Sequence, residues 1–383
     1  MIFWGLYIKI YQIILLQTKE GSFIMAQFKK IAVLTSGGDA PGMNAGVRAV
    51  ARCAADKGIE IVGVVGGYRG LIYDEFVDLP AAFTANIIRR AGTALYTDRC
   101  LEFKEEEGMQ KAIETCKKHG IEAIVAIGGD GTFRGANDLC LHGIPTIGIP
   151  GTIDNDITAT DYTIGFDTAQ NTVIEALSYL HDTCESHARC NVVEIMGRDC
   201  GELTLRAGIA AGALAIVVPE IPFDEAAAIE NIKKRKAAGQ RGMLVAVSEG
   251  VLTPDGKKYG EVLAKKIEAE TGVETKFARL AHFQRGGRPS ARDRFTVSLM
   301  GAKAVDLLLE GKSNMFVCEI EGKIEAVDIK WGIAADRMYK KKLKDGELDN
   351  FTAEQIDAMK ALCERRTKEL KELYDLGLVL AKA

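Results

Sequence analysis

The sequence predicts an α/β protein made of two Rossmann-like three-layer lobes, with mostly parallel sheets and a cleft between them. Short apolar runs alternate along the chain with stretches in which apolar residues recur at helical spacing. This alternation is typical of parallel sheets that are covered by helices on both faces. A chain of 383 residues, 47% of them hydrophobic, is long enough to build more than one such lobe.

The expected elements follow from these patterns in chain order. In the first part we expect strands at 31–34, 59–65, 123–127 and 145–149. Gly58 predicts the end of one helix. A second helix is expected at 105–119 and should end at Gly120. Asp167 and Gln170 resemble a capping box at the start of the next helix. Later we expect strands at 192–196, 215–218, 244–247 and 276–280, with a surface-packed helix at 352–376.

Composition excludes several classes of function. The net charge is -4 and no long basic run occurs, so we expect no nucleic-acid partner. The nine cysteines contain no CxxC pair and the five histidines contain no HxxxH pair, which argues against a zinc site. We therefore expect a reduced, cytoplasmic protein. Residues 1–24 are too interrupted for a spanning helix, so we expect an upstream extension before Met25 and no membrane partner.

Three predicted strand ends carry polar and glycine-rich segments: TSGGD at 35–39, GGDGT at 128–132 and PGTIDND at 150–156. Open α/β sheets hold their ligands at the carboxyl ends of the strands. Glycines there let backbone N–H groups approach a phosphate, and the following helix N-terminus favours the anion. In the third segment Asp154 and Asp156 are two residues apart, and such a carboxylate can accept a proton from a substrate hydroxyl.

From about Phe28 to about Ala335 the chain resembles the 6-phosphofructokinases, through the motifs TSGGDAPGMNA, IGGDGT, PGTIDND, TDYTIGFDTA, MGR and HFQRGG. The resemblance implies phosphorylation of D-fructose 6-phosphate at the 1-hydroxyl by ATP, with Mg2+, as a committed step of glycolysis. It also implies an allosteric homotetramer, or at least a homodimer that shares the sugar-phosphate site.

The same resemblance implies roles for individual residues. Asp154 would be the base, Arg198 would stabilise the transferring phosphoryl group, and Thr152 would flank the reacting centre. ATP and its magnesium would be bound by Gly38, Tyr68, Arg99, Lys104, Asp130, Gly131, Thr132 and Gly135, with Asp130 as the metal ligand. The sugar phosphate would be bound by Thr152, Asp154, Asp156, Arg189, Met196, Gly197, Arg198, Glu249, Lys276, His282 and Arg285, with Arg189 coming from a neighbouring subunit.

Two glycines favour ATP over pyrophosphate as the donor. Pyrophosphate-using relatives usually carry Asp in place of Gly131 and Lys in place of Gly151. The alternatives that stay open are a pyrophosphate-dependent enzyme, a non-catalytic regulatory subunit of a hetero-oligomer, and side activity on another phosphosugar. Asp154, Asp130 and Arg198 are all present, which argues against the silent subunit.

The chain departs from the family pattern at two places. Lys276 stands where a second arginine usually holds the 6-phosphate. Strand alternation predicts that Lys276 and His282 lie on the same face and that Arg279 points to the opposite face. In the bacterial effector pocket Arg48 and Arg52 are kept. The usual charged contacts are replaced by Ala81, His181, Leu214, Ala238 and Gln240, which puts control by ADP and phosphoenolpyruvate in doubt.

We expect an ATP-binding lobe at 25–165 plus about 284–333. The sugar-phosphate lobe is expected at 166–283 plus about 334–352, followed by a C-terminal helical extension at 353–383.

Overall fold

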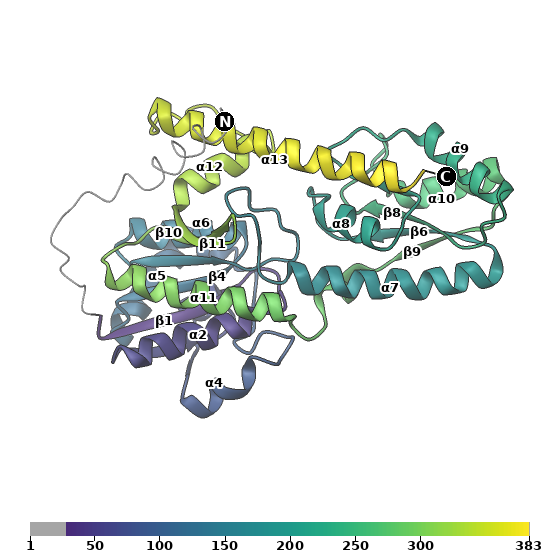
Figure 1. Ribbon diagram of the computed structural model, residues 1–383. Helices are drawn as coiled ribbons and strands as arrows, with labels where there is room; N and C mark the ends of the chain where they lie inside the picture. Colours follow the sequence, from purple (N-terminus) through teal and green to yellow (C-terminus); the bar gives the residue numbers. More distant parts are fainter. Residues whose placement is uncertain (1–27, 383) are drawn as a thin grey trace. The chain divides into compact units, whose positions relative to one another are not determined.

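The computed structural model describes residues 28–382, which form two compact units (Figure 1). The first unit runs through Thr152 and adds Ile157–Ile164 and Pro289–Arg366. The second contains Ile153–Asp156, Gly165–Arg288 and the residues from Thr367 onward. The predicted upstream extension at 1–24 lies outside the described residues.

The first unit is built on a seven-stranded sheet in its described part. Its strands are β1 (Lys30–Ser36), β2 (Glu60–Val64), β3 (Phe76–Asp78), β4 (Ala123–Gly128), β5 (Thr146–Pro150), β10 (Met315–Ile320) and β11 (Lys323–Asp328). They lie in the order β11-β10-β5-β4-β1-β2-β3, parallel except for the two edge strands β3 and β11. The central strands are buried along most of their length, as the uninterrupted apolar runs predict.

Helices cover both faces of this sheet (Figure 1). They are α2 (Met43–Asp56), α3 (Tyr68–Ile72), α4 (Ala81–Ile87), α5 (Glu106–His119), α6 (Asp130–Leu141), α11 (Ala291–Leu309), α12 (Ile329–Tyr339) and the start of α13 (Ala353–Leu380), with the short 3-10 helix η1 (Glu102–Lys104). Helices α2 and α11 pack together on one face, while α5, α6 and α12 share a hydrophobic core with the other face.

The second unit contains a four-stranded, fully parallel sheet in the order β7-β8-β6-β9. Its elements are α7 (Phe166–His187), β6 (Cys190–Ile195), α8 (Glu202–Ala210), β7 (Ala215–Val217), α9 (Glu225–Ala237), β8 (Met243–Ser248), α10 (Tyr259–Thr271), β9 (Thr275–Arg279) and the 3-10 helix η2 (Ala281–Arg285). Helices α9 and α10 supply core side chains to one face, and α7 and α8 pack on the sheet as well as on each other.

The predicted fold class is confirmed, whereas several details differ from the expectation. Helix α7 begins after Gly165, which has φ 102 and no side-chain cap, so Asp167 lies inside the helix and the predicted capping box is wrong. The antiparallel hairpin of β10 and β11 was not expected. Residues 334–352, which we assigned to the sugar-phosphate lobe, belong to the first unit.

Helix α13 is more than the surface extension we expected. Ala358 and Met359 are buried in the core of the first unit, and the Trp331 indole donates a hydrogen bond to the carbonyl of Gln355. From Thr367 onward the helix counts with the second unit. Among the described residues, no helix combines the length and apolar character needed to cross a membrane.

Candidate active site

The three glycine-rich segments meet at one edge of the first unit's sheet. Strand order reverses between β1 and β4: the chain goes from β1 outward to β2, and later from β4 outward to β5. Ser36 at the end of β1 is the register partner of Gly128 at the end of β4. The Gly151 amide donates to the Gly128 carbonyl at 2.9 Å, which adds the end of β5. Such a reversal is where open α/β sheets bind ligands.

Gly128 makes this close approach possible. A Cβ atom on Gly128 would lie 2.2 Å from Thr132 Oγ1 and 2.4 Å from the Ser36 carbonyl oxygen. The Thr132 hydroxyl instead donates to that carbonyl at 3.1 Å. Only glycine therefore lets the turn after β4 close against the end of β1.

Several of the predicted ATP-binding residues come together around this turn. Tyr68 is buried, donates from its hydroxyl to the Thr132 carbonyl, and stacks on Phe103 with ring centroids 4.2 Å apart. A Cβ atom on Gly135 would lie 2.6 Å from the Tyr68 ring, so this glycine is required by packing. Gly38 is half-buried, while Arg99, Lys104 and Gly131 are exposed.

Asp130 is the first residue of α6, directly after the glycine-rich turn that follows β4. Its carboxylate accepts hydrogen bonds from Arg134, at 3.2 Å from Nε and 2.6 Å from Nη2. The positive end of the α6 dipole stabilises negative charge at this position. An anion or a cation-bound phosphate beside Asp130 would therefore meet a helix N-terminus and one carboxylate.

In the second unit the predicted base is already paired with a positive charge. Asp154 is fully buried, and Arg198 Nε lies 3.2 Å from Asp154 Oδ2. Arg198 adopts φ 53, in the left-handed region that is uncommon for a residue with a side chain. The turn that carries it follows β6, so two separate strand-end segments contribute to the pair.

Glu249 holds the backbone of the turn that carries Arg198. Its Oε1 accepts hydrogen bonds from the backbone amides of Gly197 at 3.2 Å and Arg198 at 2.9 Å. A Cβ atom on Gly250 would lie 2.1 Å from the Arg198 carbonyl oxygen, so glycine is needed where the two turns touch. Glu249, expected only as a sugar contact, thus also holds the backbone of Arg198.

Two of the predicted 6-phosphate ligands converge on one acid. Glu274 forms ion pairs with Arg189 at 2.8 Å and with Lys276 at 2.9 Å. Hydrogen bonds from Arg189 and then Lys276 lower the pKa of the Glu274 carboxyl to about 2. The two cations therefore lie close together, on either side of one carboxylate.

The prediction that His282 shares a strand face with Lys276 is wrong. Strand β9 ends at Arg279, and His282 and Arg285 lie in η2, where strand alternation no longer applies. Arg279 pairs with its register neighbour Glu194 at 2.7 Å, so it does not stand in for the missing arginine in this structure.

Gln284, in the same HFQRGG motif, was not identified as important. It is fully buried, accepts a hydrogen bond from the Met196 amide at 3.1 Å and donates to the Ala281 carbonyl at 3.0 Å. It thereby ties η2 to the segment that carries Met196. An amide within a polar motif was the only available signal.

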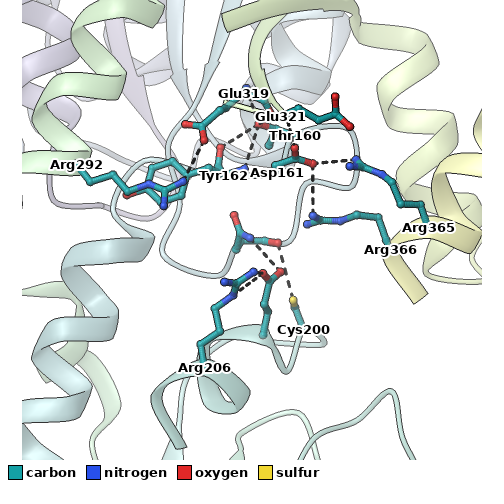
Figure 2. Close-up of polar contacts among 12 residues, drawn as sticks. Thr160, Asp161, Tyr162, Cys200, Arg206, Arg292, Glu319, Glu321, Arg365 and Arg366 are labelled. Carbon is teal, nitrogen blue, oxygen red and sulfur yellow. Dashed lines mark hydrogen bonds and ion pairs between the residues drawn. The ribbon is translucent and has the colours of Figure 1, made fainter. Parts of the chain in front are cut away.

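The segment Ile157–Ile164 is anchored by residues from the end of the first unit (Figure 2). Asp161 forms ion pairs with Arg365 at 2.8 Å and with Arg366 at 3.7 Å, both on α13. The Arg292 guanidinium lies 4.1 Å from the centroid of the Tyr162 ring. At the base, the Thr163 hydroxyl donates to the carbonyl of Thr152 at 2.7 Å, so the anchored segment supports the predicted substrate contact.

Comparisons with known proteins identify relatives of this chain. The phosphofructokinase family model matches residues 30–308. The ATP-dependent 6-phosphofructokinase 1 of Clostridium perfringens is 50% identical over 315 residues, which cover 82% of this chain and 97% of that protein. The ATP-dependent 6-phosphofructokinase of Shouchella clausii is 51% identical over 289 residues, or 76% of this chain and 89% of that one.

The fold has a solved counterpart in the phosphofructokinase from Saccharomyces cerevisiae, with a TM-score of 0.79 and 32% identity over 90% of this chain. This chain spans 49% of the length of that yeast chain. Family model, relatives and fold all lead to one conclusion: the chain belongs to the phosphofructokinase family.

Proposed function

We propose that this chain is an ATP-dependent 6-phosphofructokinase, which phosphorylates D-fructose 6-phosphate at the 1-hydroxyl and yields fructose 1,6-bisphosphate and ADP in glycolysis. The observation that carries the proposal is the buried Asp154 with Arg198 at 3.2 Å, just beyond the end of β5. It combines a proton acceptor with a positively charged guanidinium, the two groups that phosphoryl transfer to a hydroxyl requires.

In this proposal Asp154 accepts the proton of the sugar 1-hydroxyl as the oxygen attacks the terminal phosphoryl group. Arg198 then shifts from the carboxylate toward the phosphoryl oxygens, where negative charge gathers in the transition state. Its backbone is held by Glu249, so only the side chain needs to move. Thr152 and Asp156 flank the reacting centre.

Mg2+ fits the residues around Asp130 if it arrives with the nucleotide. Within residues 28–382 no group of three or more His, Cys, Asp or Glu side chains is arranged to hold a metal ion alone. Magnesium is usually held by one or two carboxylates together with substrate phosphates, so one carboxylate at the α6 N-terminus is sufficient. When bound, the ion would neutralise phosphate charge during transfer. Asp130 would give up its hydrogen bonds with Arg134 and would then help to orient the ion.

We further propose the remaining site roles from the family resemblance. Gly38, Tyr68, Arg99, Lys104, Gly131, Thr132 and Gly135 bind ATP, and Arg189, Met196, Gly197, Lys276, His282 and Arg285 bind the sugar phosphate with Glu249. Arg189 serves the site of a neighbouring subunit in a homotetramer, or at least a homodimer. The enzyme acts in the cytoplasm.

The space around two glycines supports ATP over pyrophosphate. A Cβ atom on Gly131 would meet nothing within 4 Å, so the open volume beside α6 remains available to a nucleotide phosphate. A Cβ atom on Gly151 would lie 2.9 Å from the end of the Met43 side chain, so a lysine there would require this methionine to move. The aspartate and the lysine that pyrophosphate-using relatives carry at these two positions are both absent from this chain.

A coupled assay tests the proposal. The purified chain is given fructose 6-phosphate with either ATP or pyrophosphate, and fructose 1,6-bisphosphate is measured as it forms. We expect turnover with ATP and Mg2+ and at least a hundredfold lower rate with pyrophosphate. Equal rates, or a faster rate with pyrophosphate, would support the alternative donor. A folded protein inactive with both would support the non-catalytic subunit.

A further inference from the structure

A buried polar cluster outside the predicted site residues holds the neighbour of Asp154. Asn155 is 2% exposed and adopts φ 49, in the left-handed region. Asparagine tolerates this region better than most residues because its short amide can form local hydrogen bonds. The Asn155 side-chain amide donates to Glu202 Oε2 at 3.0 Å. The Asn155 side chain therefore helps to fix the turn that carries Asp154.

Glu202 is itself held firmly. It is the first residue of α8 and 7% exposed, so the helix N-terminus stabilises its charge. Its second oxygen, Oε1, accepts from Arg206 one turn later, at 2.9 Å from Nε and 2.7 Å from Nη2. Figure 2 shows Arg206 together with Cys200 in this cluster. The two oxygens of one carboxylate thus serve two different partners.

The start of α8 and the Arg206 side chain both have further supports. The Gly201 amide donates to Glu220 Oε1 at 2.8 Å, and a Cβ atom on Gly201 would lie 2.4 Å from Val218 Cβ. The Arg206 guanidinium lies 6.0 Å from the centroid of the Phe166 ring. The carboxylate of Glu202 therefore has a defined place from which to hold Asn155.

We propose that Glu202, supported by Arg206, is a positioning residue for phosphoryl transfer: it holds Asn155 in the left-handed conformation that directs Asp154 at Arg198. The proposal rests on the function proposed above. When the Asn155 amide loses its acceptor, the turn relaxes and the adjacent Asp154 carboxylate leaves its place. A catalytic group misplaced by about 1 Å can cost ~10²-fold in rate, whereas ATP binding by the other unit has no reason to change.

Four variants and one control test this inference. Glu202→Ala and Asn155→Ala remove the hydrogen bond, Asn155→Gly removes it but keeps the left-handed backbone accessible, and Arg206→Lys keeps the charge behind Glu202. The control, Glu225→Ala, removes a glutamate at the same helix position in α9, where it pairs with Lys266 and accepts from the Tyr259 hydroxyl. It matches the loss at a helix N-terminus without touching the Asp154 turn.

We expect kcat to fall about 10–100-fold in Glu202→Ala with the KM for ATP within about twofold of wild type. The kcat of Asn155→Ala should fall as far as that of Glu202→Ala. The loss in kcat should be smaller in Asn155→Gly and smallest in Arg206→Lys, and the Glu225→Ala control should keep a kcat near wild type. In a double-mutant cycle, Asn155→Gly should add little to Glu202→Ala, because both remove the same bond. Wild-type kcat in folded Glu202→Ala, or fully additive losses, would overturn the proposal.

Hydrogen exchange separates this inference from the proposed reaction. In the full chain without substrate, the amides of residues 153–156 should exchange at least tenfold faster in Glu202→Ala than in wild type or the Glu225→Ala control. That result supports the positioning role even if another substrate proves to be the true one. Unchanged exchange at 153–156 would overturn it even if fructose 6-phosphate is phosphorylated as proposed.

Discussion

Arg198 Nε lies 3.2 Å from Asp154 Oδ2, and the two residues come from separate turns of the second unit. Asp154 is completely buried, whereas the Arg198 side chain is about half exposed. The buried member needs the pair more, because an isolated carboxylate in the interior is costly. The exposed member keeps the freedom to swing toward a substrate. This asymmetry suits a base that stays in place beside a cation that moves.

Gly131→Asp should damage ATP use far more than binding of fructose 6-phosphate. The open space around Gly131 means that the added side chain meets no protein atom within 4 Å of its Cβ, so folding should be preserved. A new carboxylate there would repel the nucleotide phosphates. We expect at least a tenfold rise in the KM for ATP, measured at saturating sugar phosphate. An unchanged KM and kcat would place the nucleotide elsewhere.

Lys276→Arg should strengthen binding of the sugar phosphate. Lysine provides a point charge, whereas arginine provides a bidentate fork for phosphate. We expect the KM for fructose 6-phosphate to fall severalfold in Lys276→Arg and to rise by about tenfold or more in Lys276→Gln, with kcat nearly constant. The measurement is a sugar-phosphate saturation curve for each variant. A KM that does not respond to Lys276→Gln would remove Lys276 from the site.

ADP and phosphoenolpyruvate should act weakly on this enzyme. The Arg52 guanidinium donates to the Ala81 carbonyl at 2.7 Å, and Leu214 is buried in the core of the second unit. Two missing charge-assisted hydrogen bonds, at about 1.5–3 kcal/mol each, weaken an effector about a hundredfold or more. Saturation curves for fructose 6-phosphate with and without millimolar effector provide the test. A large midpoint shift would mean that other residues have rebuilt the pocket.

Arg366→Gln should destabilise the first unit. The Arg366 side chain is 11% exposed and belongs with Arg365 to the pair that anchors Asp161. Removing one charged partner of a largely buried group should lower the free energy of unfolding by about 1–3 kcal/mol. Urea unfolding of the full chain measures this loss, with Lys368→Gln on the exposed side of α13 as control. Equal stability of both variants would show that the Asp161 anchor contributes little.

The sequence allowed prediction of strands β1, β2 and β4 to β9 and of the segments at their ends, because apolar runs and glycine-rich turns are local patterns. Strands β3, β10 and β11 were not predicted. It did not reveal the roles of Gln284 or Glu202, since each acts through a partner far away in the chain: Gln284 through the Met196 amide and Glu202 through Asn155. Helix α13 was predicted from its periodicity. Its burial at Met359 depends on tertiary packing that periodicity alone does not specify.

The most direct test of the account is the turnover of Asp154→Asn with ATP and fructose 6-phosphate. Asparagine keeps the size of the side chain but cannot accept the proton, a contribution of ~10²–10⁴-fold to rate. We predict that kcat falls by that amount while binding of fructose 6-phosphate, followed by titration calorimetry, stays within severalfold of wild type. A folded Asp154→Asn variant with near wild-type turnover would contradict the assignment of Asp154 as the base.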